Sequence, residues 1–200
     1  MYYTDIYQYF SIIFQYNNTL NNQILKSNLF ILIFLLIPVC TLAQGNLIEN
    51  RESKISQLRL RLIEKSVKEF EVGDVWGKIT VFSDAESSDY RVLNESQSAE
   101  YGQWIEEYII YQNQLIFLKE TSLDWLAEQQ NQYQLVESTY YFSDEKSGIK
   151  KSKSILINSN RISTEDLEKL STQTPTLDTL SLSDFNLKQA ELQKLLKSPE

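Results

Sequence analysis

The sequence contains no histidine, and its single cysteine, Cys40, lies close to the N-terminus. Without histidine the chain has no Ser-His-Asp or Cys-His catalytic group, no His-ligated zinc and no imidazole for acid-base chemistry near neutral pH. Residues 44–200 contain no cysteine, so they have neither a disulfide framework nor a thiolate nucleophile. An enzyme built from this chain would have to work with Asp, Glu, Lys and Tyr.

Basic residues are also scarce relative to acidic ones, with 19 Lys and Arg against 27 Asp and Glu and a net charge of −8. An acidic chain repels polyanions, so we expect neither a nucleic acid nor an anionic lipid surface as a partner. No Gly-rich phosphate loop, Asp-rich calcium loop or metal-ligand spacing occurs in the sequence. We therefore expect no cofactor, no metal and no enzymatic activity.

The chain has one long hydrophobic run, LFILIFLLIPV at residues 29–39. A transmembrane helix needs about 20 apolar residues, whereas the apolar region of a signal peptide needs about 7–15. Lys26 precedes the run and small residues follow it, which predicts a signal peptide over residues 25–43 with cleavage after Ala43. The predicted location is secreted or periplasmic; the alternative is an envelope protein that keeps this segment as a membrane anchor.

Residues 1–24 are rich in aromatics and contain no Lys or Arg, which is not typical of the start of a signal peptide. Our hypothesis is a mis-annotated extension, with Leu25 read from an alternative start codon, or a disordered one. The alternative is an aromatic tail that lies at a membrane surface. Cys40 follows the branched residue Val39, where a lipidation signal needs a small residue, so we favour an inert cysteine over a lipidated one.

Residues 44–160 predict an α+β domain, in which an N-terminal helix packs on an antiparallel β-meander of about five to seven strands. Residues 161–200 predict a C-terminal helical segment. The elements follow from helical or alternating apolar spacing. They are a polar lead-in over 44–52, a helix over 53–71 capped by Ser53, strands over 78–82, 90–93, 103–111, 115–120, 133–142 and 149–157, a loop over 94–102, a short helix or polar connection over 122–132, a helix over 163–170, a linker over 171–182 and a last helix capped by Ser183.

The clearest local element is the hairpin of residues 103–111 and 115–120. Asn113 in its turn is the residue best able to adopt a left-handed conformation. Alternation along the first strand places three large side chains on one face, which we expect the N-terminal helix to cover: Trp104, Tyr108 and Ile110.

The hairpin EYIIYQNQLIFL at residues 107–118 resembles a recurring unit of secreted bacterial proteins of unknown function. The segment ESTYYF at residues 137–142, followed by a turn and Gly148, resembles a second copy. The unit is also similar to the Tyr-Tyr-x-x-Gly hairpin repeats of MORN-variant, antitoxin-component-like proteins. This resemblance covers residues 50–157, although Asn113 replaces a glycine and the second turn is longer. It implies a meander and a secreted protein, and no known activity.

Two charged groups are candidates for chemistry. Glu106 and Glu107 are adjacent on a strand and point to opposite faces, whereas Glu106 and Glu120 can meet across the hairpin like the two acids of a glycosidase. We favour a solvated strand face over that catalytic pair. Four lysines form a second group, which either receives an anionic partner or, as we favour, protects an edge strand from unwanted pairing: Lys146, Lys150, Lys151 and Lys153.

Tryptophans form the third candidate group. Trp76, Trp104 and Trp125 can stack on sugar rings or form a protein-binding surface, although we expect at least two of them in the core.

We expect a secreted or periplasmic, non-enzymatic binding module. Its partner is an unidentified protein or surface ligand, and it meets the membrane only through the signal segment. The possible binding surface comprises Trp104, Tyr108, Tyr140, Lys150 and Lys151. The alternatives are a carboxylate-dependent hydrolase or carbohydrate-binding protein, and an envelope-anchored protein.

Overall fold

A computed structural model describes residues 45–99, 102–126 and 132–197. The predicted signal peptide and the extension before it lie outside the described residues. The described elements from Asn46 onwards belong to one unit. Within this described part of the chain, no helix is long and apolar enough to cross a membrane.

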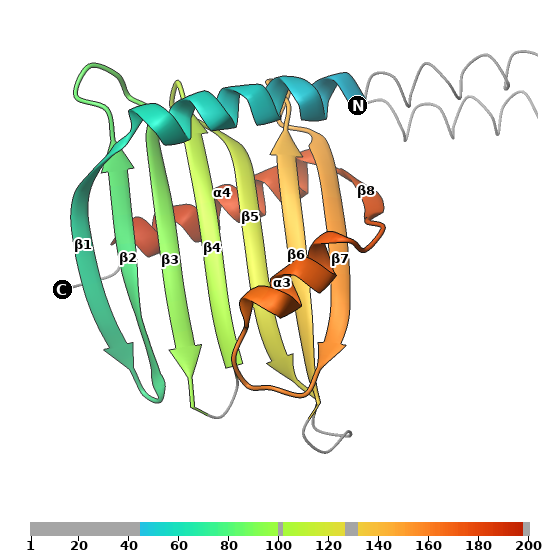
Figure 1. Cartoon of the computed structure of the whole chain (residues 1–200). Helices are drawn as coiled ribbons and strands as arrows, with labels where there is room; N and C mark the ends of the chain where they lie inside the picture. The colour runs from blue at the N-terminus through green and yellow to red at the C-terminus, as the bar shows by residue number, and fades with distance from the viewer. Residues whose placement is uncertain (1–44, 100–101, 127–131, 198–200) are drawn as a thin grey trace, which may run out of the picture. The chain divides into compact units, whose positions relative to one another are not determined.

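Eight strands form one antiparallel sheet, and their order in the sheet is their order in the sequence (Figure 1). This meander confirms the predicted α+β fold class, and it extends the expected sheet by one strand. The strands are β1 (Ile63–Val72), β2 (Val75–Ser83), β3 (Tyr90–Ser98), β4 (Gly102–Tyr111), β5 (Gln114–Trp125), β6 (Tyr133–Phe142), β7 (Gly148–Ile157) and β8 (Thr176–Leu180).

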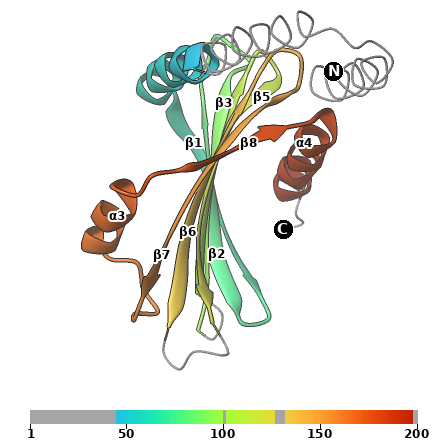
Figure 2. The same ribbon diagram turned by 90° about the vertical axis from the view of Figure 1, so that its right-hand side faces the viewer.

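Helices cover both faces of this sheet (Figure 2). The N-terminal helix (residues 45–61) and α3 (Thr164–Ser171) lie on one face, and α4 (Leu182–Lys197) lies on the other. We call the two sides the opposite face and the α4 face, respectively. Figure 1 shows the N-terminal helix crossing one end of the strands, whereas α3 lies nearer the other end.

Three clusters of buried side chains hold these layers together. Phe185 and Leu192 of α4 pack against Tyr108, Phe142 and their neighbours on the α4 face. The N-terminal helix and α3 each have a cluster of their own on the opposite face. The first joins Ile55, Leu58 and Leu62 to Ile109, Ile116, Phe117 and Tyr141, and the second joins Leu170 to Leu123, Leu135 and Ile157.

The prediction of one helix over residues 53–71 is wrong. The helix spans residues 45–61, so it includes most of the expected polar lead-in, and Ser53 lies inside it. Helical spacing continues backwards from Ile55 to Ile48, which packs on the same cluster. Residues after Leu62 instead pair with β2, and the left-handed Gly73 (φ 65°) makes the connection.

Several segments that we expected to be loops are strands. β3 continues through Ser98, β5 continues to Trp125, and the expected linker contains β8. The C-terminal segment is therefore not purely helical. These stretches are polar, but neighbouring strands satisfy their backbone groups along the whole ladder, which side-chain pattern alone does not reveal.

The last helix begins earlier than predicted, and Ser181 rather than Ser183 caps it. The Asp184 backbone N–H donates to Ser181 Oγ at 3.3 Å, and the Ser181 N–H donates to Asp184 Oδ2 at 2.7 Å. This reciprocal pair is a capping box. The helix predicted at residues 163–170 is confirmed as α3, which has a capping box between Ser163 and Asp166.

The face that carries Trp104, Tyr108 and Ile110 is covered by α4, and the expectation that the N-terminal helix covers it is wrong. The predicted left-handed conformation of Asn113 is confirmed, because Gln112 and Asn113 have φ values of 50° and 63°. Two successive positive values are typical of a type I′ turn, which matches the twist of the flanking strands.

Candidate functional site

A groove of about 410 Å³ opens on the α4 face. Its lining comes from two adjacent rows of side chains that run across the strands. One row contains Ser96, Trp104, Ser122 and Val136, and the next contains Glu106, Glu120 and Ser138. Ile105, Thr121 and Asp124 complete the lining. We call this the acid groove.

Glu106 and Glu120 are register partners across β4 and β5, which confirms that the two acids meet across the hairpin. Both oxygens of Glu120 accept hydrogen bonds, one from Lys188 Nζ at 2.6 Å and one from the Tyr140 hydroxyl at 2.6 Å. Glu106 Oε2 accepts from Asn94 Nδ2 at 2.9 Å. The two carboxylates are thus positioned by β3, β6 and α4.

Burial of Glu106 raises its pKa, and the negative charge of Glu120 adds to this effect against the opposing hydrogen bond from Asn94. Burial lowers the pKa of Lys188, but its hydrogen bonds and ion pairs with Glu120 and Glu191 outweigh burial and leave the pKa raised. The favoured interpretation of this pair as a solvated strand face is therefore wrong, since both carboxylates are partly buried and bonded to protein groups.

Glu107 points to the opposite face, as alternation predicts. Arg59 Nε of the N-terminal helix donates to Glu107 Oε1 at 2.9 Å, and Arg91 Nε lies 2.6 Å from the same oxygen. Glu107 is buried, so this group of charges fastens the helix to the sheet and takes no part in the acid groove.

The charge of the acid groove is unbalanced. The described residues that line it include three carboxylates, Glu106, Glu120 and Asp124, and no Lys or Arg. Asn94 beside Glu106 is only 9% exposed, and its Oδ1 has no hydrogen-bond partner among the described groups. The groove thus combines an indole, several hydroxyls and excess negative charge.

The five residues of the predicted binding surface do not share one exposed surface. Trp104 lines the acid groove, but Tyr108 and Tyr140 are buried beneath α4. Lys150 Nζ lies 5.4 Å from the ring centroid of Tyr140 on the α4 face. Lys151 lies on the opposite face, 3.7 Å from Glu52 of the N-terminal helix.

The predicted lysine patch is likewise divided between the faces. Lys153 Nζ donates to the Ser171 carbonyl at 2.7 Å, on the side of α3. β8 pairs with residues Gly148–Ser152 of β7, so Lys150 and Lys151 do not lie on an open edge. A single basic patch and edge protection are therefore both wrong for these two lysines, because sequence spacing did not reveal the eighth strand.

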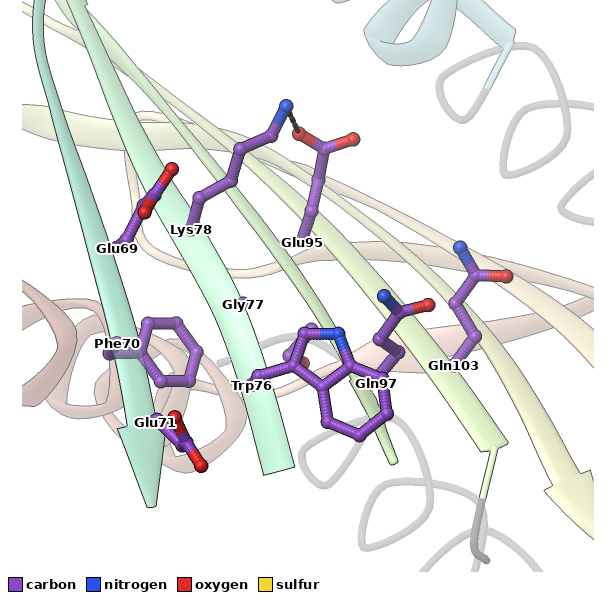
Figure 3. A pocket seen from close by; sticks show the side chains of 10 residues that line it. Glu69, Phe70, Glu71, Trp76, Gly77, Lys78, Glu95, Gln97 and Gln103 are labelled. Atoms are coloured by element: carbon purple, nitrogen blue, oxygen red, sulfur yellow. Dashed lines mark ion pairs between the residues drawn. The ribbon is translucent and has the colours of Figure 1, made fainter. Parts of the chain in front are cut away.

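A second groove, of about 650 Å³, lies on the opposite face of β1 to β4, and Figure 3 shows it from close by. Trp76, Gln97 and Gln103 are register partners on three adjacent strands. In the next row Lys78 Nζ pairs with Glu95 Oε2 at 2.9 Å. Glu69, Phe70, Glu71, Gly77 and Ser96 complete the lining, and we call this the platform groove.

The tryptophans are less buried than we expected. Trp76 and Trp125 are 42% and 49% exposed, so the prediction of at least two core tryptophans is wrong. Trp76 shares its side of β2 with the charged Lys78, and this polar alternation was the signal in the sequence that could have identified an open face.

Comparison with protein-family models, with curated proteins and with solved structures found no match. The resemblance to secreted proteins with aromatic hairpins therefore stays a prediction. Within the described part of the chain, no group of three or more acidic, His or Cys residues is arranged to hold a metal ion.

Proposed function

We propose that this chain is an exported, non-enzymatic binding protein whose acid groove takes an organic cation. The ligand presents an ammonium or guanidinium group to the carboxylates and an apolar surface to Trp104. The observation that carries this proposal is one groove lined by Trp104 and by the directly paired Glu106 and Glu120. Export rests on the signal peptide predicted over residues 25–43.

The charges of the groove favour a cationic ligand. Lys188 of α4 pairs with both Glu120 and Glu191, so its single charge is shared between two carboxylates. The raised pKa of Glu106 reflects a carboxylate whose burial is incompletely compensated. A ligand cation would offset that cost, and an indole face attracts cations through its quadrupole. Hydroxyls of Ser96, Ser122 and Ser138 provide further hydrogen bonds.

A carboxylate-dependent hydrolase is the second candidate, because two acids lie side by side in an aromatic groove. Glu106, with its raised pKa, suits a general acid. Glu120, however, already accepts hydrogen bonds at both oxygens. These bonds stabilise its anion and lower its nucleophilicity, which supports binding over hydrolysis.

Calorimetric titration of the protein with spermidine, arginine amide and glucosamine tests the binding proposal. We expect at least one of these cations to bind, and Glu106→Gln and Trp104→Ala to weaken that binding by about tenfold or more. N-acetylglucosamine, which lacks the ammonium charge, should bind less tightly than glucosamine. Glu165→Gln on α3 and Trp125→Ala are matched controls outside the groove and should bind like the unaltered protein.

Two results would contradict the proposal: none of the three cations binds, or Glu106→Gln leaves their affinity unchanged. Hydrolysis is tested separately with chromogenic aryl glycosides. We expect no turnover above the buffer rate. Turnover that disappears in both Glu106→Gln and Glu120→Gln would instead support the hydrolase.

A further inference from the structure

We propose that the platform groove is a second binding site, which takes an uncharged oligosaccharide or polysaccharide chain. This groove lies on the opposite face of the sheet from the acid groove, and the two share only Ser96 among their described lining residues. The proposal therefore does not depend on what the acid groove binds.

The indole of Trp76 supplies the stacking surface. It is 42% exposed although it lies in the middle of a hairpin, and Figure 3 shows its ring standing beside the side chains of Gln97 and Gln103. A sugar ring has an apolar face of C–H groups, which packs on a flat aromatic surface, while its hydroxyls need polar partners around the rim. Trp76 provides the first of these two requirements.

Gln97 and Gln103 provide the second. Each amide carries both a donor and an acceptor, so it can pair with a hydroxyl in either direction. The register places Gln97 next to Trp76 and Gln103 on the strand beyond. Adjacent strands are about 4.8 Å apart, so the three side chains extend over about 10 Å in a straight row. This geometry suits an extended chain of sugar rings.

The floor of the groove is kept low by Gly77. A Cβ built at Gly77 would lie 2.2 Å from the Glu95 carbonyl oxygen and 2.8 Å from Cζ of Phe70. A side chain therefore cannot be accommodated at this position without displacing the backbone of β3. The close approach of Phe70 and β3 leaves a flat surface beside Trp76, against which a ring can lie.

The charges around the groove select against acidic chains. Glu69, Glu71 and Glu95 face it together with Lys78, and Glu95 is already paired with Lys78. The local charge is thus negative, as is the net charge of −8 of the whole chain. Uronate or sulfate groups would be repelled, whereas a neutral glycan would not.

The test is calorimetric titration of the protein with cellohexaose, chitohexaose, maltohexaose and laminarihexaose, with polygalacturonate as the acidic arm. We expect at least one neutral hexasaccharide to bind. Trp76→Ala should weaken that binding by about tenfold or more, and Gln97→Ala with Gln103→Ala by several-fold. Trp125→Ala, which removes an equally exposed indole outside the groove, should bind like the unaltered protein.

Three results would overturn the proposal: none of the four hexasaccharides binds, Trp125→Ala weakens binding as much as Trp76→Ala, or polygalacturonate binds as tightly as the neutral chains. Circular dichroism and urea unfolding of Trp76→Ala verify that the variant is folded. Trp104→Ala in the acid groove separates the two proposals, because it should leave saccharide binding at the platform groove unchanged.

Discussion

Glu106 and Glu120 lie directly opposite each other across β4 and β5, yet different elements hold their carboxylates. Asn94 on β3 donates to Glu106, whereas Lys188 on α4 donates to Glu120. The acid pair therefore depends on the docking of α4 onto the sheet, although both glutamates come from one hairpin.

The first prediction concerns the ionisation of Glu106. Its pKa is raised in the folded state, so the folded protein takes up a proton at a higher pH than the unfolded chain does. Above the raised pKa both states are ionised and the folded state carries the full cost of burial. As the pH falls through the raised pKa towards the ordinary value of about 4.3, this cost is removed and stability increases.

Glu106→Gln removes the charge but keeps an acceptor for Asn94. We expect it to raise the free energy of unfolding at pH 8 and to lose the part of the pH dependence that Glu106 contributes above its ordinary pKa. Urea unfolding at pH 8 and pH 5 measures both effects, with exposed Glu165→Gln as the control. A lower stability of Glu106→Gln at pH 8 would show that the ionised form is favoured in the folded state.

The second prediction concerns Lys188. The side chains of Lys188 and Glu120 are 18% and 24% exposed, so Lys188→Met leaves a partly buried carboxylate with Tyr140 as its remaining donor. We expect a loss of about 1–3 kcal/mol in the free energy of unfolding. Lys169→Ala breaks an exposed pair with Glu165 and should cost about 0.5 kcal/mol or less. Equal losses in urea unfolding would refute a special role for the buried pair.

The third prediction tests the packing of α4 on the sheet. Ile110 is 1% exposed in the cluster that α4 covers, so Ile110→Ala should cost about 2–5 kcal/mol. Leu156 on β7 is 58% exposed, and Leu156→Ala should change stability by about 0.5 kcal/mol or less. Both values come from denaturant unfolding. Similar small effects at the two positions would mean that the α4 face is not a packed core.

The fourth prediction concerns the turn between β4 and β5. Asn113 has φ 63°, a conformation that glycine adopts without steric cost. Asn113→Gly should therefore raise the melting temperature slightly, whereas Asn113→Val should lower stability by about 1–2 kcal/mol, because a β-branched residue is strained there. Thermal unfolding followed by circular dichroism distinguishes the two. A destabilising Asn113→Gly would indicate that the asparagine side chain makes a necessary contact.

Local sequence predicted those parts of the structure whose signals are short-range. The strand at residues 133–142 was found because β-branched and aromatic residues alternate in it. The pairing of Glu106 with Glu120 was found because a short turn fixes the register of its hairpin. The strand ends at Ser98 and Trp125 were missed, since a polar strand is held by the backbone of its neighbours rather than by its own side chains.

The sequence by itself determined the acid-base chemistry open to this chain, the α+β class and which side chains share a face of each strand, since these follow from composition and from the alternation of a pleated strand. Only the tertiary structure decided which of those faces are covered. α4, which is distant in sequence, buries Tyr108 and leaves Trp104 in a groove, while the opposite face leaves Trp76 open beyond the N-terminal helix. Burial depends on long-range packing, which the pattern of a single strand does not contain.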